Sequence, residues 1–324
     1  MSVDSFIIDG TRSPIGTKNG QMVGVRSDDL TAQVILGLMK RNENVPSEVV
    51  EDVVVGCAFP EGPQGMLMAR SISVLADLPI ESGAKIVNRF CGSSMDSVHQ
   101  LSQAILAGDI DAGIAGGVED MFGVPMGGFN PSFNPELYEK EFYIGMGEST
   151  EILAKDLDIS REDQEAFAVK SHEKALAAIA AGRYDNEIIP AQVNGVEVSK
   201  DEGPRTPDLD KIKSLDPAFD SEGTITAATS SPISIGAAAA LIMGGDKAKE
   251  LGLSPKFKIK SRAVAGVEWT RMGSGPLPAT EKALAKAGLQ LSDIDAIELN
   301  EAFAAQSLYA VSYTHLTLPT KRIV

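Results

Sequence analysis

Short apolar runs alternate with helical patterns in the first third of this 324-residue chain, and this alternation most constrains its fold. Residues 53–55 predict a buried strand, residues 85–88 a second strand and residues 112–115 a third. Between the last two runs, the apolar residues of positions 98–105 recur at helical spacing. Because a strand, a helix and a strand within about 35 residues make a βαβ unit, we expect an α/β fold with a parallel sheet.

Cys91 lies where the second of these strands turns into the helix, in the segment Asn88-Arg89-Phe90-Cys91-Gly92-Ser93-Ser94-Met95. At a helix N-terminus, the unpaired backbone N–H groups and the helix dipole favour the thiolate form of a cysteine. A thiolate so placed is a nucleophile, so the position of Cys91 predicts covalent acyl chemistry. The alternative is a buried, unreactive cysteine, which is the commoner role of this residue type.

Composition and charge exclude several classes of protein. The net charge of −16 argues against a nucleic-acid-binding surface, which needs basic stripes. The two cysteines, Cys57 and Cys91, give no disulfide framework and fit a reducing compartment. The first residues lack the pattern of a signal peptide, and no apolar run is long enough to span a bilayer. We therefore expect a cytoplasmic protein.

The middle of the chain differs from the regular segments on either side of it. Residues 119–229 are rich in loop-forming residues and predict a large insertion, part helical and part loop. Ser160-Arg161-Glu162-Asp163 predicts the start of its main helix, which should end near Gly182. Long ordered loops are usually functional, so we expect a functional role for this insertion. The alternative is a solvent-exposed loop region without such a role. After the insertion we expect regular structure to return at 236–243, followed by a helix at 246–251, a strand at 256–265 and a helix at 279–287.

A weak internal repeat connects the two regular parts. Residues 47–55 and residues 292–299 each follow a predicted helix. Each has the same predicted order of features: a polar turn that begins with Ser, an acidic residue and a buried strand. A duplicated α/β half predicts this pattern, and the alternative is chance similarity between two ordinary connections. If the repeat is real, the second half stops in mid-unit. Residues 312–324 depart in composition from the acidic body and predict a non-native tail, the alternative being a genuine C-terminal strand.

Four segments of the sequence resemble the thiolase family, and within it the bacterial 3-ketoacyl-CoA thiolases of fatty-acid β-oxidation. The resemblance rests on Arg12-Ser13-Pro14-Ile15-Gly16, residues 88–95, Gly116-Gly117-Val118-Glu119, and Asn300-Glu301-Ala302-Phe303-Ala304-Ala305-Gln306. It implies a layered αβαβα architecture of two duplicated βαβ-type halves, the second incomplete. The implied parts are an N-terminal half at 1–118 plus about 230–268, a loop domain at 119–229 and a partial C-terminal half at 269–311.

The resemblance also implies a reaction. Cys91 would attack the 3-keto carbon of a 3-ketoacyl-CoA, acetyl-CoA would leave, and a second CoA would collect the acyl group from the cysteine. Asn300 would hold a water for the oxygen of the departing enolate. The resemblance places the CoA or substrate near Met146, Phe219, Ser231, Met272, Phe303 and Arg205.

Each implied position also has a simpler explanation. Asn300 could close a turn after a strand, and Ser231 could cap a helix near residue 236. The two methionines and two phenylalanines could be core packing. Arg205 could be a solvated charge.

The sequence also departs from the family. The family uses a His in a Gly-His-Pro segment as the base for the nucleophile, and a second Cys in a Gly-rich loop as general acid and base; neither has a counterpart in the 324 residues. His99, His172 and His315 do not match the catalytic His, and Cys57 reads as a core residue. We therefore expect a protein of these 324 residues alone to have little or no thiolase activity.

Two other functions stay open from the sequence: a biosynthetic acetoacetyl-CoA thiolase, and a non-catalytic thiolase-like protein that binds acyl-CoA or lipid. The resemblance implies CoA as co-substrate, with no permanently bound cofactor and no metal. It implies a homodimer or homotetramer for the full-length protein and a hydratase/dehydrogenase partner of β-oxidation. From charge and composition we expect no nucleic-acid partner and no membrane span.

Overall fold

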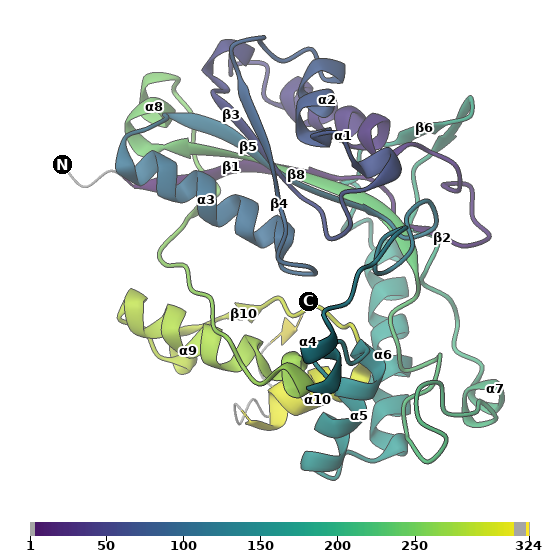
Figure 1. The fold of residues 1–324 in the computed structure, drawn as a ribbon. Helices are drawn as coiled ribbons and strands as arrows, with labels where there is room; N and C mark the ends of the chain where they lie inside the picture. Colours follow the sequence, from purple (N-terminus) through teal and green to yellow (C-terminus); the bar gives the residue numbers. More distant parts are fainter. Residues whose placement is uncertain (1–3, 314–321, 324) are drawn as a thin grey trace. The chain divides into compact units, whose positions relative to one another are not determined.

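The computed structural model describes residues 4–313 and 322–323, and its chain forms two compact units (Figure 1). The first unit comprises Met1–Pro131, Gly182–Gly203 and Ile233–Ile259. The second comprises Ser132–Ala181, Pro204–Pro232 and Lys260–Val324. Each unit is therefore assembled from segments that lie far apart in the sequence.

A mixed seven-stranded sheet forms the centre of the first unit, in the order β4-β3-β5-β8-β1-β9 with β2 beside β8. Strands β3, β4 and β5 are parallel, as the βαβ pattern predicts. Strand β8 runs antiparallel to both β5 and β1, and this makes the sheet mixed rather than parallel throughout. The strands are β1 (Ser5–Arg12), β2 (Gly16–Thr17), β3 (Asp52–Gly56), β4 (Gly83–Val87), β5 (Ala112–Asp120), β8 (Ser234–Gly244) and β9 (Phe257–Lys258).

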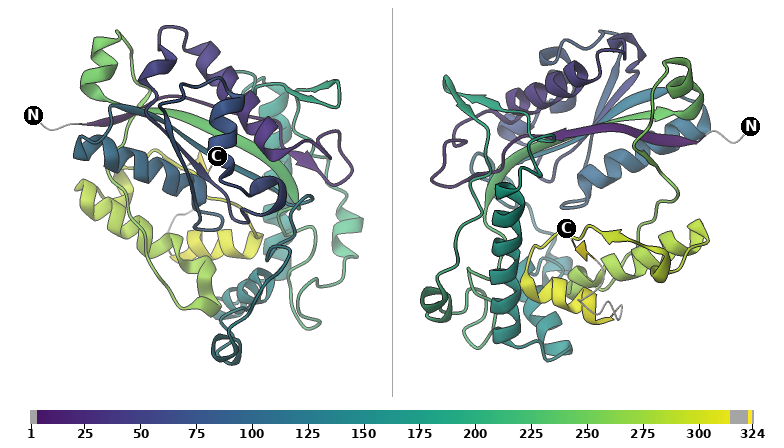
Figure 2. Two further views of the ribbon diagram at one scale, coloured as in Figure 1. Left: turned by 45° about the horizontal axis from the view of Figure 1, so that its top comes forward. Right: turned by 180° about the vertical axis from the view of Figure 1, so that it is seen from behind.

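Helices cover both faces of this sheet. Helices α1 (Ser27–Arg41) and α2 (Met68–Leu75) lie on one face and α3 (Ser93–Ala107) on the other (Figures 1 and 2). The side chains of β3 alternate accordingly: Val53 and Val55 pack in the core with α1 and α2, and Val54 packs in the core with α3. The continuous valine run is thus a strand buried on both faces. Helix α8 (Gly245–Glu250) and the hairpin of β6 (Ala191–Val193) and β7 (Val196–Val198) complete this unit.

Two expectations about element ends are corrected. The predicted strand at 256–265 is limited to Phe257–Lys258, which pair with β1, and the N–H of Ile259 donates a last hydrogen bond to the carbonyl of Ser5 (3.0 Å). The strand ends there because the chain leaves the first unit after Ile259, and Lys260 belongs to the second unit. No helix lies near residue 236, where the chain is part of β8, so Ser231 caps no helix there.

The second unit is mainly helical. Its main helix α6 begins after Ser160, whose hydroxyl accepts a hydrogen bond from the N–H of Asp163 (3.1 Å), and this confirms the predicted cap. Apolar side chains of α5, α9 and α10 form one of its cores. The helices are α4 (Pro135–Glu139), α5 (Met146–Asp156), α6 (Arg161–Ala180), α7 (Leu209–Lys213), α9 (Pro276–Ala287) and α10 (Ala304–Tyr313).

The segments of the predicted repeat have the same local structure. A 3₁₀ turn at Ser47–Val49 lies between α1 and β3, and one at Leu291–Asp293 lies between α9 and β10 (Ala296–Ile297). The division into duplicated halves and a loop domain, with the boundaries given above, stays a prediction.

Most of the predicted non-native tail, residues 314–321 and 324, lies outside the described residues, and so does His315. Of the remainder, residues 312 and 313 end α10, and β11 (Arg322–Ile323) pairs in parallel with β10. Among the helices that are described, we find none with the length and apolarity needed to cross a lipid bilayer.

Candidate active site

A tight turn in the first unit presents Cys91 at the surface between β4 and α3. The side chain of Asn88 accepts a hydrogen bond from the N–H of Phe90 (2.9 Å). The hydroxyl of Ser93 accepts from the N–H of Arg89 (2.8 Å) and donates to the carbonyl of Phe90 (2.6 Å). These bonds hold Phe90 at φ +45°, a left-handed conformation that costs a non-glycine residue about 1 kcal/mol.

Two glycines allow the start of α3 to lie directly on the strands. A Cβ atom on Gly56, at the end of β3, would overlap the backbone of Ser93 and Ser94. A Cβ atom on Gly117 of β5 would overlap the side chain of Ser94. The turn that carries Cys91 therefore sits against the carboxyl ends of β3 and β5, the edge of a parallel sheet where active sites are usually found.

The ionisation of Cys91 differs from the sequence-based expectation. Desolvation by the surrounding protein raises the pKa of the thiol, its own backbone N–H lowers it, and the carboxylate of Glu119 raises it further. The net direction is upward, whereas its place before a helix predicted a lowered pKa. One backbone donor does not outweigh desolvation and a nearby negative charge. The thiol is therefore mostly protonated at neutral pH, and its use as a nucleophile calls for a base.

Sequence reasoning missed Glu119 as part of this site, although it belongs to a segment that carries the family resemblance. It lies near the end of β5, and its carboxylate accepts hydrogen bonds from the N–H groups of Ala58 (2.7 Å) and Phe59 (3.3 Å). The other cysteine, Cys57, is buried as predicted, and its thiol lies 3.7 Å from the same carboxylate. Burial and Glu119 raise the pKa of Cys57 to about 12, which leaves it un-ionised at neutral pH.

The other predicted site residues all lie in the second unit, and several of them lie together. Phe303 is 8% exposed, and its ring meets the ring of Phe219, which is 38% exposed, edge to face at 5.6 Å. Met146, at the start of α5, packs against the core that contains Phe303. The N–H of Ser231 donates to the carbonyl of Ala302 (2.8 Å), beside Phe303.

Asn300, Met272 and Arg205 lie on other parts of this unit. Asn300 is exposed in the loop between β10 and α10. Met272 is exposed in the 3₁₀ segment Trp269–Ser274. Arg205 is exposed, and its backbone N–H donates to Nδ1 of His172 at 3.4 Å. The structure thus groups Met146, Phe219, Ser231 and Phe303, while their assignment to CoA stays a prediction.

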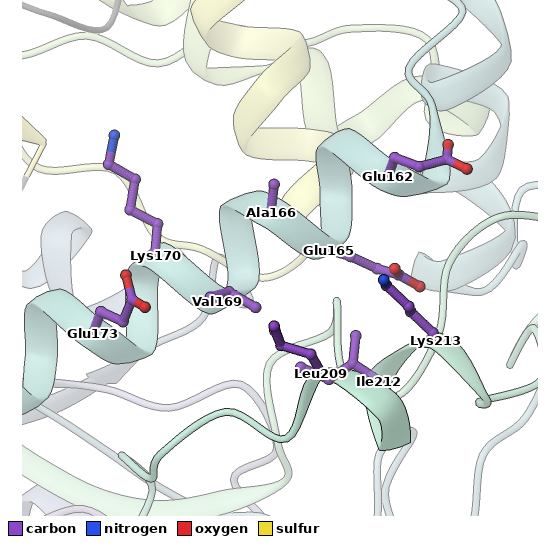
Figure 3. A pocket seen from close by; sticks show the side chains of 9 residues that line it. All are labelled: Glu162, Glu165, Ala166, Val169, Lys170, Glu173, Leu209, Ile212 and Lys213. Atoms are coloured by element: carbon purple, nitrogen blue, oxygen red, sulfur yellow. The ribbon is translucent and has the colours of Figure 1, made fainter.

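A groove of about 410 Å³ lies between α6 and α7, where Val169 faces Leu209 and Ile212 (Figure 3). Charged side chains from both helices border it, and none of the predicted site residues lines it. Its lining is Glu162, Glu165, Ala166, Val169, Lys170, Glu173, Leu209, Ile212 and Lys213. Within the described ranges, no cluster of three or more His, Cys, Asp or Glu side chains has the arrangement of a metal site.

A mixed sheet covered by helices, with an exposed cysteine at a strand-to-helix turn, defines an α/β protein suited to acyl transfer through a thiol. The sequence profile of the thiolase N-terminal domain matches residues 5–246, and that of the thiolase C-terminal domain matches residues 253–323. The chain belongs to the thiolase family, which is a family of acyltransferases.

Individual relatives agree with this assignment. A 3-ketoacyl-CoA thiolase of Alcanivorax borkumensis is 47% identical over 94% of this chain and 80% of its own length. A 3-ketoacyl-CoA thiolase of Bacillus subtilis is 42% identical over 95% of this chain and 83% of its own length. The crystal structure of the Bacillus anthracis acetyl-CoA acetyltransferase matches with a TM-score of 0.88 at 33% identity, over 98% of this chain and 84% of that chain. The predicted α/β thiolase fold is confirmed.

Proposed function

We propose that the protein cleaves 3-ketoacyl-CoA with CoA, giving acetyl-CoA and a shortened acyl-CoA through an acyl group on Cys91. The observation that carries the proposal is the exposed thiol at the turn before α3, in a chain 42–47% identical to 3-ketoacyl-CoA thiolases. A soft sulfur nucleophile suits this reaction, because both the intermediate and the product are thioesters.

The proposed reaction has two steps. The thiolate of Cys91 adds to the 3-keto carbon, the bond between C2 and C3 breaks, and its electron pair leaves with the acetyl-CoA fragment as an enolate. A proton then converts this enolate to acetyl-CoA, and the acyl group remains on Cys91 as a thioester. In the second step the thiolate of a free CoA attacks that thioester and expels Cys91. Nothing is oxidised or reduced.

The raised pKa of Cys91 bears on the first step. A mostly protonated thiol needs a base to take its proton, and the 324 residues contain no Gly-His-Pro segment to supply the expected His. We therefore propose that a chain of only these residues forms the acyl-cysteine slowly and turns over little. Raising the pH should partly replace the base, because it increases the thiolate fraction directly.

The second unit supplies the proposed contacts with CoA. Phe303, Phe219 and Met146 form an apolar group that suits the pantetheine chain, and Ser231 offers a hydroxyl beside it. Met272 and the guanidinium of Arg205 are the remaining proposed contacts, with Arg205 directed to a phosphate. Asn300 would hold a water that donates to the enolate oxygen.

Two alternatives receive no better support. A biosynthetic acetoacetyl-CoA thiolase would use the same cysteine in the reverse direction, and the acetyl-CoA acetyltransferase of Bacillus anthracis shows that this fold carries the related activity. A non-catalytic binder of acyl-CoA or lipid would not need an exposed thiol at a strained turn. We propose a cytoplasmic homodimer or homotetramer for the full-length protein, with a hydratase/dehydrogenase partner, CoA as co-substrate, and neither a permanently bound cofactor nor a metal.

The test compares acetoacetyl-CoA with a longer 3-ketoacyl-CoA as substrates. The assay is run on the 324-residue chain and on a form in which residues 312–324 are replaced by the corresponding C-terminal segment of a 3-ketoacyl-CoA thiolase. We expect acetyl-CoA production from the longer form and little from the 324 residues. Full activity of the 324 residues would refute the need for a further base. No activity of either form with either substrate would refute the thiolase assignment.

A further inference from the structure

The carboxylate of Glu119 binds the loop that follows β3, formed by residues 58–64. One oxygen accepts a hydrogen bond from the N–H of Ala58 (2.7 Å). The other accepts from the N–H of Phe59 (3.3 Å) and from the side-chain amide of Gln64 (2.8 Å). Because three N–H groups of one loop converge on a single side chain, Glu119 fixes this loop to the end of β5.

Gln64 attaches the same loop to the sheet a second time. Its side chain is fully buried, and its amide also donates to the carbonyl of Phe59 (2.9 Å). Its side-chain oxygen accepts from the backbone N–H of Asp120 (2.6 Å), the residue after Glu119. Moving the 58–64 loop would therefore leave several buried polar groups without partners, which is strongly unfavourable.

The 58–64 loop in turn supports the turn that carries Cys91. The side-chain amide of Asn88 donates to the carbonyl of Ala58 (2.8 Å), and its oxygen accepts from the N–H of Phe90 (2.9 Å). The rings of Phe59 and Phe90 lie 5.9 Å apart. Phe90 is the residue in the left-handed conformation, and a backbone in such a conformation persists only where its surroundings hold it.

We propose that Glu119 is a positioning residue for the nucleophile: by binding the 58–64 loop it holds the turn that presents Cys91. The role rests on the proposed function, because Cys91 is the nucleophile only if that function holds. Glu119 acts through the loop and needs no contact with the substrate. Two sets of contacts connect Glu119 with the turn that carries Cys91. One is the hydrogen bonds of Ala58 and Asn88, and the other is the contact between the rings of Phe59 and Phe90.

The charged side chains of the turn and of the 58–64 loop have partners of their own. Arg89 is paired with Asp96 of α3 at 3.2 Å, and Glu61 of the loop accepts a hydrogen bond from the N–H of Phe129 (2.8 Å). Glu119 is the carboxylate whose charge raises the pKa of the Cys91 thiol. The buried thiol of Cys57 lies 3.7 Å from the same carboxylate.

Two substitutions separate the hydrogen bonds of Glu119 from its charge. Glu119→Asp keeps the charge but is one methylene too short to reach the loop, and Glu119→Gln keeps the length but loses the charge. In both, we expect the amide protons of Ala58 and Phe59 to exchange with solvent at least about tenfold faster, since each loses a bond to a charged acceptor. The pH midpoint of Cys91 alkylation by iodoacetamide should fall in Glu119→Gln and stay in place in Glu119→Asp.

Asp120→Asn is the matched control. It removes a carboxylate at the next residue, one that caps its own turn by accepting from the N–H groups of Phe122 (2.9 Å) and Gly123 (3.0 Å). We expect it to leave the exchange of the Ala58 and Phe59 amides and the alkylation midpoint unchanged. Equal effects of Asp120→Asn and Glu119→Gln would overturn the proposal.

Acylation gives the functional readout. With a 3-ketoacyl-CoA, Glu119→Asp should form acyl-Cys91 about tenfold more slowly at an unchanged half-saturating substrate concentration, as expected when a nucleophile is misplaced but binding is intact. Unchanged amide exchange and unchanged acylation in Glu119→Asp would overturn the proposal. If the variants do not fold, amide exchange is measured in the wild type alone. Rapid exchange of the Ala58 and Phe59 amides there would overturn the proposal. If the wild type forms no acyl-Cys91 even at raised pH, where more of the thiol is ionised, the proposed function fails. The amide-exchange data test the role of Glu119 independently of that outcome.

Discussion

Gly56→Ala tests how closely the turn that carries Cys91 is packed against the sheet. The added Cβ would overlap the backbone of Ser93 and Ser94, which cannot rotate away as a flexible side chain could. The start of α3 must therefore shift. Overpacking of this kind destabilises a protein by about 1–3 kcal/mol, which exceeds the few tenths to 1 kcal/mol that an alanine gains over a glycine through the unfolded chain.

Gly10→Ala is the control for this substitution. Gly10 is also a strand glycine of the same sheet, but the nearest atom to its added Cβ is the carbonyl oxygen of Ala239 at 3.7 Å, an ordinary contact. We expect Gly10→Ala to be neutral or slightly stabilising.

Urea unfolding and thermal melting measure the difference. For domains of roughly 150–250 residues, 1 kcal/mol corresponds to about 2–4 °C in Tm, so Gly56→Ala should melt several degrees below the wild type. Iodoacetamide labelling of Cys91 should change in the same variant, because α3 and the turn before it move together. If Gly56→Ala is as stable as Gly10→Ala and labels like the wild type, the close packing of α3 on β3 is refuted.

Three further predictions follow from the electrostatics and packing of the two units. Labelling of Cys91 by iodoacetamide should rise steeply between about pH 7 and pH 9, because its raised pKa leaves the thiol protonated at neutrality; a rate that is already maximal at pH 7 would contradict this. Phe303→Ala should destabilise the protein by about 3–5 kcal/mol in urea unfolding, since the ring is buried and pairs with Phe219; a loss below about 1 kcal/mol would count against the packing described. Burial lowers the pKa of His172, the charge of Arg205 lowers it further, and Glu301 opposes this in part. Because the unfolded chain therefore takes up the proton more readily, stability should be lost as the pH falls below about 6.5, the ordinary value for a histidine. His172→Gln should abolish this part of the acid dependence, and an unchanged acid dependence would show that His172 does not cause it.

The sequence predicted the elements whose signals are local. The valine run at 53–55 and the capping serine of α6 both form the structures that their patterns indicate. The place of Cys91 between a strand and a helix is also confirmed.

Features that depend on distant partners were not predictable in the same way. The direction of β8 relative to β5 is set by packing across the sheet, so the mixed topology is not visible in either strand alone. Strand β9 is short because the chain passes into the second unit at Lys260, which the apolar pattern of residues 256–265 does not show.

The chemistry of the site shows the same limit. A helix start predicts an acidic thiol, but the pKa of Cys91 responds to desolvation and to Glu119, which is 28 positions away. The partners of Glu119 lie on the loop after β3, a connection that only the folded chain makes. Spacing in the sequence signals a candidate nucleophile, but not the groups that hold it.

The location of the acyl group after reaction tests most directly whether Cys91 is the nucleophile. The chain is incubated with a 3-ketoacyl-CoA in the absence of free CoA at about pH 9, where the thiolate fraction of Cys91 is much larger than at neutral pH. The protein is then digested and analysed by mass spectrometry. We predict an acyl group on the peptide that contains Cys91, none on Cys57, and none at all in Cys91→Ala. An unmodified Cys91, or an acyl group found on Cys57 instead, would contradict the account.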